Sequence, residues 1–356
     1  MQAQSNKLHY YSNENFAVIM INCKLQLHIQ PYMLQPTIPI VDFSAFETEK
    51  EIIATQINKA CLQNGFFYIA GHGVPPALQQ SLETLSHRFF QLPEKEKMEI
   101  AMYKAASAWR GYFPLNGELT SGKPDLKEGI YFGTELPGDD ARVQRGVPLH
   151  GANLFPKDPA GFRDIVLAYI AAVTKVGHFV MKGISLSLGL PENYFSDKYQ
   201  QDPLILFRIF HYPPQATKKD QYGVGEHTDY GLLTILKQDA VGGLQIKNGD
   251  DWIAAPPVEN TFICNIGDML DRMTGGLYRS TPHRVINVSG EDRYSFPLFF
   301  DPGFDTHVER IETASIRETK DQRWDGASVH EFSGTYGEYL LNKIGKVFPE
   351  LKKDVL

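Results

Sequence analysis

The chain has 356 residues, of which 42% are hydrophobic, so it is long enough to bury one large core or two ordinary ones. Its formal net charge is -7 with acids and bases interspersed, which leaves no basic face for nucleic acid or an anionic membrane. Three widely spaced cysteines, Cys23, Cys61 and Cys264, fit neither a disulfide framework nor a paired-cysteine zinc site. The longest apolar run near the start, residues 16–21, is too short for a signal-peptide core or a membrane span. We therefore expect a cytoplasmic protein with neither nucleic-acid nor membrane partners.

The first 36 residues show no pattern that lasts long enough to define a helix or a strand. We expect them to form an N-terminal extension that is disordered or adds one loose strand. The elements that follow are inferred from apolar spacing and from Gly or Pro at their ends. They are a short strand from Ile38, a helix over 49–64, a strand over 66–70 and a helix over 77–90. Residues 105–160 are rich in Gly and Pro, which predicts irregular loops over a site.

The second half begins with a long helix, expected from Gly161 to about Leu188, whose apolar residues share one face. Short β-type runs separated by turns come next. They cover residues 204–212, 232–237, 243–247, 261–266, 283–288 and 294–300, before a last helix over about 328–348. The pattern predicts a mainly β protein with flanking helices, its strands forming a sandwich or a rolled double sheet.

The same pattern suggests three regions along the chain. Residues 1–36 are the extension, and residues 37–160 are a helical and mixed region. Residues 161–356 form the strand-rich core with its long support helix and its C-terminal helix. The sequence shows no internal repeat or low-complexity tract.

Three residues have the chemistry and spacing of a metal site. His227 and Asp229 lie two apart, so in an extended segment both side chains leave the same face. His283 opens another predicted strand 54 residues after Asp229, far enough along the chain to lie on the facing sheet. Two imidazoles and one carboxylate leave open coordination positions, which suits iron(II) and oxygen chemistry. An H-x-D pair alone is more often a surface pair, so the surrounding residues decide.

Arg293 and Ser295 support the interpretation of the three residues as a metal site. They follow His283 by ten and twelve positions and share one face of the next predicted strand. A guanidinium and a hydroxyl on one face can bind a carboxylate through charge-assisted hydrogen bonds.

At this point the chain resembles the isopenicillin-N-synthase-like branch of the iron(II) and 2-oxoglutarate oxygenases. The resemblance covers Ile38 to about Asp305 and depends on motifs that occur in the family's order. These are 38-IPIVDF-43, 65-GFFY-68, 71-GHGV-74, 89-FFQLP-93, 227-HTD-229, 243-GLQ-245, 265-NIGD-268, 283-HRV-285 and 293-RYS-295. The combination is highly specific.

The resemblance implies a double-stranded β-helix, or jelly-roll, core of the cupin-like kind. It implies iron(II) held by His227, Asp229 and His283, with 2-oxoglutarate and O2 as cosubstrates and ascorbate as a supporting reductant. Arg293 and Ser295 would bind the distal carboxylate of 2-oxoglutarate, with a hydroxyl added by Tyr212. The implied reaction is hydroxylation or desaturation of a small molecule, with release of succinate and CO2.

One position departs from the family pattern. Many members carry Asn two residues before the tyrosine, and Phe210 stands there in this chain. A polar contact to the cosubstrate is therefore missing or replaced.

The substrate pocket is predicted from strand alternation. Counting by twos from Ser295 places Phe299 and Asp301 on the inward face, although a core Phe and a turn Asp would look the same. Arg208 shares a face with Tyr212 and could meet substrate, cosubstrate or a structural ion-pair partner. Loop residues that could cover the mouth of the site are Arg110 and Tyr112, the former also explicable as a solvated arginine.

Two rival functions follow from the same residues. One is an iron oxidase of the same fold in which Arg293 and Ser295 hold a substrate carboxylate, or an enzyme that fragments 2-oxoglutarate to ethylene. The other is a zinc-type hydrolase or a non-catalytic jelly-roll binding protein. The sequence specifies neither the primary substrate nor the oligomeric state.

Overall fold

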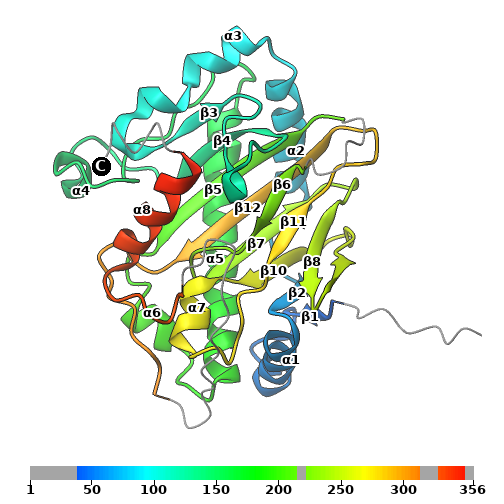
Figure 1. Cartoon of the computed structure of the whole chain (residues 1–356), viewed down its shortest axis with the longest axis vertical. Coiled ribbons are helices and arrows are strands. Elements are labelled where there is room, and N and C mark those ends of the chain that lie inside the picture. Colours follow the sequence, from blue (N-terminus) through cyan, green and yellow to red (C-terminus); the bar gives the residue numbers. More distant parts are fainter. Residues whose placement is uncertain (1–37, 215–221, 313–327, 349–356) are drawn as a thin grey trace, which may run out of the picture. The chain divides into compact units, whose positions relative to one another are not determined.

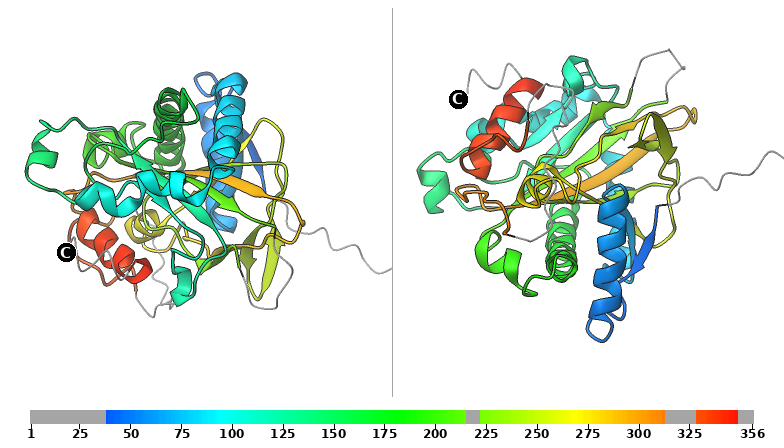
Figure 2. Two further views of the ribbon diagram at one scale, coloured as in Figure 1. Left: turned by 90° about the horizontal axis from the view of Figure 1, so that it is seen from above. Right: turned by 60° about the horizontal axis from the view of Figure 1, so that its bottom comes forward.

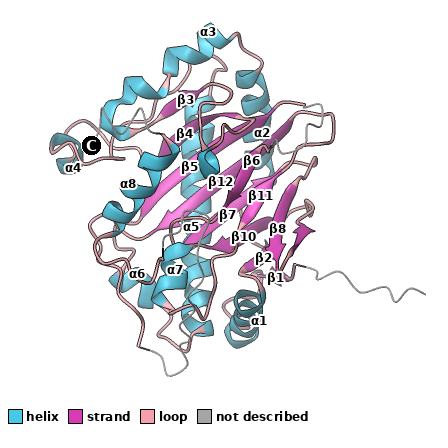
Figure 3. Ribbon diagram, viewed as in Figure 1, coloured by secondary structure: helices cyan, strands magenta, loops and turns pink. Residues whose placement is uncertain are grey.

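A computed structural model of the chain describes residues 38–214, 222–312 and 328–348 (Figure 1). These described residues belong to one compact unit, and the predicted extension 1–36 lies outside them. The unit is built from two β-sheets with helices packed around them (Figure 3).

The larger sheet has eight strands in the order β1-β2-β10-β7-β12-β5-β4-β3. All neighbours in it are antiparallel except β1 and β2. Its strands are β1 (Ile40–Asp42), β2 (Phe66–Ala70), β3 (Gly111–Phe113), β4 (Glu128–Gly133), β5 (Leu204–Tyr212), β7 (Leu233–Gln238), β10 (Phe262–Ile266) and β12 (Arg293–Asp301). Its central strands are almost entirely buried, because both faces of the sheet are covered.

The smaller sheet has four strands in the order β6-β11-β8-β9. They are β6 (Val224–His227), β8 (Leu244–Asn248), β9 (Asp251–Ala254) and β11 (His283–Val285). From β5 to β12 the chain passes repeatedly between the two sheets, so strands far apart in sequence become neighbours. This winding is that of the double-stranded β-helix predicted from the sequence.

Helices cover the side of the large sheet that faces away from the small one (Figure 2). The long helix α5 (Phe162–Ser187) packs against β7 and β12, and α1 (Lys50–Gln63) and α2 (Pro76–Phe90) pack against α5. The helix α5 is long and apolar enough to cross a membrane by length and composition alone. Its buried side chains belong to the core behind the large sheet, which accounts for its apolar character.

On the other side of the large sheet lies the C-terminal helix α8 (Tyr336–Val347), drawn in red in Figure 1. Thr335 begins it with a capping box, in which its hydroxyl accepts from the Glu338 backbone and the Glu338 carboxylate accepts from the Thr335 backbone. Shorter helical segments are α3 (Glu94–Lys97), η1 (Met98–Ile100), η2 (Met102–Ala108), η3 (Thr120–Gly122), α4 (Ala141–Gln144), α6 (Tyr194–Lys198) and α7 (Asp268–Met273).

One region differs from its prediction. Residues 105–160 were expected to be irregular loops, but β4 pairs along β5 over six positions and every residue of β4 is buried. The sequence does not reveal this strand because Gly129 and Gly133 are residue types typical of turns. In the structure they are glycines because a side chain at Gly129 would collide with aromatic rings, and one at Gly133 with the Arg110 guanidinium. The prediction of loops was therefore wrong for β3 and β4.

Candidate active site

His227, Asp229 and His283 come together in the folded chain. Their ligand-capable atoms all lie within 4.8 Å of one another. The Nε2 atoms of His227 and His283 are 3.8 Å and 3.7 Å from Asp229 Oδ1. His227 ends β6 and His283 begins β11, and the two are directly paired. The expectation that His283 lies on a facing sheet was wrong, because β6 and β11 are neighbours in the small sheet.

Backbone and side-chain contacts orient the three groups. The Nδ1 atoms of His227 and His283 lie 2.8 Å and 3.2 Å from the carbonyl oxygens of Gly225 and Thr281. A carbonyl accepts only from a protonated nitrogen, so each Nε2 keeps its lone pair for a metal.

The Asp229 carboxylate is divided between two tasks. Its Oδ2 accepts hydrogen bonds from Thr234 Oγ1 at 2.5 Å and Asn265 Nδ2 at 2.7 Å, and its Oδ1 faces the imidazoles. Neither supporting residue was assigned a role from sequence, although Asn265 lies in a motif that carries the family resemblance. Side chains that orient a metal ligand from other strands cannot be recognised from their sequence spacing to that ligand.

The electrostatics keep the triad in its metal-binding state. Burial, together with the neighbouring His283, lowers the pKa of His227 to about 3. Burial raises the pKa of Asp229, but the two imidazoles and its hydrogen bonds outweigh burial and lower it below its usual value. At neutral pH, therefore, His227 is neutral and Asp229 ionised, the forms that bind metal.

Replacing Thr234 by valine or Asn265 by leucine is expected to weaken Fe(II) binding about 10- to 100-fold, because Asp229 would lose an orienting donor. Anaerobic titration with Fe(II) measures the affinity. Thr55→Val, on the exposed face of α1, is the matched control and should bind as the wild type does. Unchanged affinity in both site variants would contradict the assigned support.

Arg293 brings a buried guanidinium to the cavity that contains the triad. Its guanidinium is fully buried, its Nε donates to Gly242 O, and its Nη1 and Nη2 have no hydrogen-bond partner among the described residues. Its Cζ lies 4.6 Å from the ring centroid of Tyr212, which is opposite it in the β12–β5 register. The hydroxyls of Tyr212 and Ser295 are 3.3 Å apart in the same place.

This arrangement fits the distal carboxylate of 2-oxoglutarate. Buried guanidinium donors without acceptors are costly, and a carboxylate would satisfy both Nη atoms of Arg293 at once. The two hydroxyls add donors on the same side. Arg293, Ser295 and Tyr212, which were predicted to bind this carboxylate, thus lie close together. The Nη donors of Arg293, which are unpaired among the described residues, indicate that a carboxylate binds beside them.

Phe210 leaves the polar contact of the family pattern unmade, but an ammonium lies beside it. Lys127 Nζ is 4.7 Å from the centre of the Phe210 ring and forms ion pairs with Asp125 Oδ2 at 2.6 Å and Glu118 Oε2 at 2.9 Å. Lys127 lines the same cavity as Arg293 and Ser295. No sequence pattern singles it out, because its partners come from a loop whose course could not be predicted.

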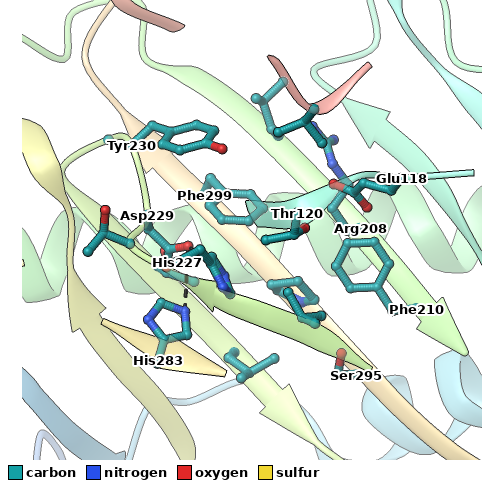
Figure 4. A pocket seen from close by; sticks show the side chains of 18 of the residues that line it. Glu118, Thr120, Arg208, Phe210, His227, Asp229, Tyr230, His283, Ser295 and Phe299 are labelled. Carbon is teal, nitrogen blue, oxygen red and sulfur yellow. Dashed lines mark hydrogen bonds and ion pairs between the residues drawn. The ribbon is translucent and has the colours of Figure 1, made fainter. Parts of the chain in front are cut away.

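The cavity between the sheets has a volume of about 150 Å³ and contains the metal triad (Figure 4). The alternation predicted for β12 is seen in its lining, which includes Arg293, Ser295, Pro297, Phe299 and Asp301. The alternation predicted for β5 is seen as well, in Leu206, Arg208, Phe210 and Tyr212.

Two predicted pocket residues lie elsewhere. Arg110 is fully buried, donates from Nη2 to Leu149 O at 2.8 Å and packs against Gly133. Tyr112 lies in β3 and donates to Glu128 Oε2 at 2.5 Å. Neither lines the cavity, because β3 pairs with β4 at the edge of the large sheet and does not fold over the mouth. Their prediction as residues of the pocket mouth was wrong.

The wall that sequence did not predict comes from α8 and from the segment before β4. The C-terminal helix contributes apolar side chains to the cavity, and polar and aromatic side chains come from further residues. Together these are Leu340, Ile344, Val347, Phe348, Trp109, Glu118, Thr120, Tyr131 and Tyr230. A C-terminal helix was predicted over about residues 328–348, but its sequence does not say which surface it covers.

Asp301 lies in the cavity lining, but other groups of the protein occupy its oxygens. Tyr336 OH donates to Oδ2 at 2.5 Å, and the backbone N–H of Leu232 donates to Oδ1 at 3.3 Å. Burial raises the pKa of Asp301 to about 7. A side chain at Gly231 would collide with this carboxylate. Asp301 therefore attaches α8 to the end of β12, and its predicted contact with substrate stays a prediction.

The raised pKa of Asp301 predicts a pH-dependent stability. The unfolded chain releases this proton near pH 4 and the folded protein near pH 7, so the wild type loses stability as pH rises between these values. Asp301→Asn has no such proton. The free energy of unfolding is measured with urea on the metal-free proteins at pH 5, 6 and 7. Relative to that of the wild type, the free energy of unfolding of the variant should rise by up to about 1.4 kcal/mol per pH unit. A constant difference would contradict the raised pKa.

Comparisons with known proteins agree with this site. Residues 38–158 match a family described as the N-terminal region of non-haem dioxygenases in morphine synthesis. Residues 203–302 match the 2OG-Fe(II) oxygenase superfamily. A probable iron/ascorbate oxidoreductase of Dictyostelium discoideum is 52% identical over 351 residues, which cover 90% of this chain and 97% of that protein.

Two further relatives bear on the chemistry. A 1-aminocyclopropane-1-carboxylate oxidase of Dictyostelium mucoroides is 41% identical over 357 residues, covering 88% of this chain and 95% of that protein. The crystal structure of a Neurospora crassa protein in complex with alpha-KG and thymine superposes with a TM-score of 0.73 at 28% identity, over 86% of this chain and 96% of that one. With both halves of the chain matched and the metal triad assembled, the chain belongs to the 2OG-Fe(II) oxygenase superfamily.

Proposed function

We propose that this protein hydroxylates or desaturates a small molecule with iron(II), 2-oxoglutarate and O2, releasing succinate and CO2. Membership of the superfamily supports the reaction class. The observation that carries the proposal is the buried guanidinium of Arg293, whose two Nη atoms lack partners among the described residues and lie beside a triad of metal ligands. A keto acid with a distal carboxylate would fit both features, because its keto acid end can bind the metal and its distal carboxylate can bind the Nη atoms of Arg293.

In this proposal His227, Asp229 and His283 hold the iron, and Arg293, Ser295 and Tyr212 hold the distal carboxylate. Bound iron and 2-oxoglutarate would together supply the oxidising chemistry, driven by O2 and decarboxylation of the keto acid.

The rest of the chain positions the substrate and excludes water. The apolar face of α8 and the ring of Phe299 close the cavity around the substrate. No acid or base has to act on the substrate, and the acidic side chains Glu118 and Asp301 are accordingly engaged with protein donors.

A second candidate is an oxidase that consumes no 2-oxoglutarate, favoured by the relative named 1-aminocyclopropane-1-carboxylate oxidase. Arg293 and Ser295 would then hold the carboxylate of the substrate itself. The two candidates differ in their products: only the first forms succinate. Ethylene in the headspace would indicate the second or fragmentation of 2-oxoglutarate.

The test is a succinate-release screen over a metabolite panel with O2 uptake recorded in parallel. His227→Ala serves as the blank. We expect slow succinate release with 2-oxoglutarate alone and a marked increase with at least one compound. Oxygen uptake without succinate would favour the oxidase, and failure of every compound, uncoupled turnover included, would contradict the proposal.

The proposal also keeps the cytoplasmic location and the absence of nucleic-acid and membrane partners expected from the sequence. The location is supported by Cys61 and Cys264, which are buried free thiols. The interspersed charges support the absence of such partners.

A further inference from the structure

Arg208 is a second buried guanidinium in the cavity, and it has no carboxylate partner among the described residues. Its side chain is held in place by backbone groups: Nη1 donates to Phe132 O at 3.1 Å and Phe207 O at 3.2 Å. The guanidinium lies over the ring of Tyr131, with Cζ 3.5 Å from the centroid. It is therefore a fixed cation. Glu118 and Asp301 attract it electrostatically, but neither forms an ion pair with it among the described residues.

The acids that could have served Arg208 are used by other groups. Glu118 accepts from Tyr131 OH at 2.7 Å and pairs with Lys127 at 2.9 Å, and Asp301 is held by Tyr336 and a backbone N–H. Because no carboxylate of the described residues pairs directly with the buried Arg208 guanidinium, an anion in direct contact with it would be favourable.

The strand register fixes where this cation lies relative to the iron ligands. Ser295 is opposite Phe210 and Leu298 is opposite Phe207, which places Pro297 opposite Arg208. On the other side of β12, Phe299 is opposite Thr234, whose hydroxyl holds Asp229. Arg208 thus lies two strand spacings, roughly 10 Å, across the sheet from the strand that supports the metal ligand.

Arg208 is also separate from the anion site at Arg293. Tyr212, which is opposite Arg293, lies four positions beyond Arg208 in β5, so the two guanidinium-bearing positions are roughly 13 Å apart along the strands. The keto acid bound at Arg293 and the metal therefore leaves Arg208 for another molecule. Figure 4 shows Arg208 and Glu118 across Phe299 and Thr120 from the metal triad.

We propose that Arg208 binds the carboxylate of the primary substrate, which is a small organic acid whose apolar body lies over Phe299 beside the iron. This assignment rests on the proposed function. Phe299, Leu206, Leu340 and Ile344 form an apolar surface for the body of the acid. The carboxylate at Arg208 then fixes which C–H bond faces the metal.

The test measures binding, so that it does not depend on turnover. Anaerobic protein saturated with Fe(II) and 2-oxoglutarate is titrated by calorimetry with matched acids and their neutral amides: hexanoate and hexanamide, benzoate and benzamide, phenylacetate and phenylacetamide. At least one acid should bind about 10- to 100-fold more tightly than its amide, the usual effect of a charge-assisted hydrogen bond. Equal binding of every acid and its amide would overturn the proposal.

Variants of Arg208 test whether the tighter binding of the acid depends on this residue. Arg208→Gln should remove the preference for the acid and Arg208→Lys should keep part of it, because lysine retains the charge but not the planar fork. Arg163→Gln, a half-exposed arginine on α5, is the matched control and should bind as the wild type does. Preference unchanged in Arg208→Gln would contradict the assignment.

The visible absorption of iron with bound 2-oxoglutarate reports the cosubstrate in the same samples. The Arg208 variants should keep this band, which also shows that they are folded. If Arg208→Gln weakened 2-oxoglutarate binding as strongly as acid binding, Arg208 would serve the keto acid and the proposal would fall. Absence of the band in the wild type would contradict the proposed function itself.

Discussion

Replacing His227 by alanine is expected to lower Fe(II) affinity by about 10²- to 10³-fold and to reduce succinate release to background. Loss of one of three protein ligands is expected to remove roughly 3–4 kcal/mol of metal-binding free energy. The two remaining ligands, Asp229 and His283, lie 3.7 Å apart and cannot close the gap without moving paired strands. Metal content after anaerobic loading and succinate formation are the two readouts.

The control for this variant is His307→Ala, since His307 is exposed and lies outside the cavity lining. It should retain full iron and full succinate release. Stoichiometric iron in His227→Ala with undiminished turnover would show that the triad is not the metal site.

The second large effect is expected for Arg293→Gln, which should raise the dissociation constant of 2-oxoglutarate about 10²- to 10³-fold. The substitution removes both orphaned Nη donors, and each charge-assisted hydrogen bond contributes roughly 1.5–3 kcal/mol. Arg293→Lys should be intermediate, because it keeps a point charge and loses the bidentate fork. The measurement is titration of 2-oxoglutarate into the anaerobic iron-loaded protein.

A stability measurement distinguishes a binding role for Arg293 from a structural one. Buried guanidinium donors without acceptors are costly to the fold, so Arg293→Gln should unfold at the same or a higher urea concentration than the wild type when no keto acid is present. Added 2-oxoglutarate should stabilise the wild type and not the variant. Strong destabilisation of the variant without ligand would contradict the assignment.

Strand alternation allowed much of the site to be predicted. A period of two, extended from Ser295 and from Tyr212, placed Phe299, Asp301 and Arg208 on the faces of β12 and β5 that line the cavity. The metal triad was predicted from residue type and spacing. Only the relation between its strands was wrong, because spacing along the chain does not say whether a chain that winds between two sheets returns to the first.

The parts that could not be predicted depend on long-range packing. Thr234 and Asn265 support Asp229 from strands whose mutual register was unknown, and the wall formed by α8 depends on how the C-terminal helix docks. Arg110 and Tyr112 were misplaced because a Gly- and Pro-rich stretch is typical of loops, whereas its glycines here allow two strands to pack closely.

The most direct test of the iron and keto-acid site is an anaerobic absorption spectrum of the iron-loaded protein before and after addition of 2-oxoglutarate. Only iron(II) with the keto acid bound to it gives a visible charge-transfer band, which zinc does not. We expect the band in the wild type, its loss in His227→Ala and its appearance only at higher 2-oxoglutarate concentration in Arg293→Gln. A wild-type protein that bound both iron and 2-oxoglutarate without forming the band would contradict the site described for His227, Asp229 and His283.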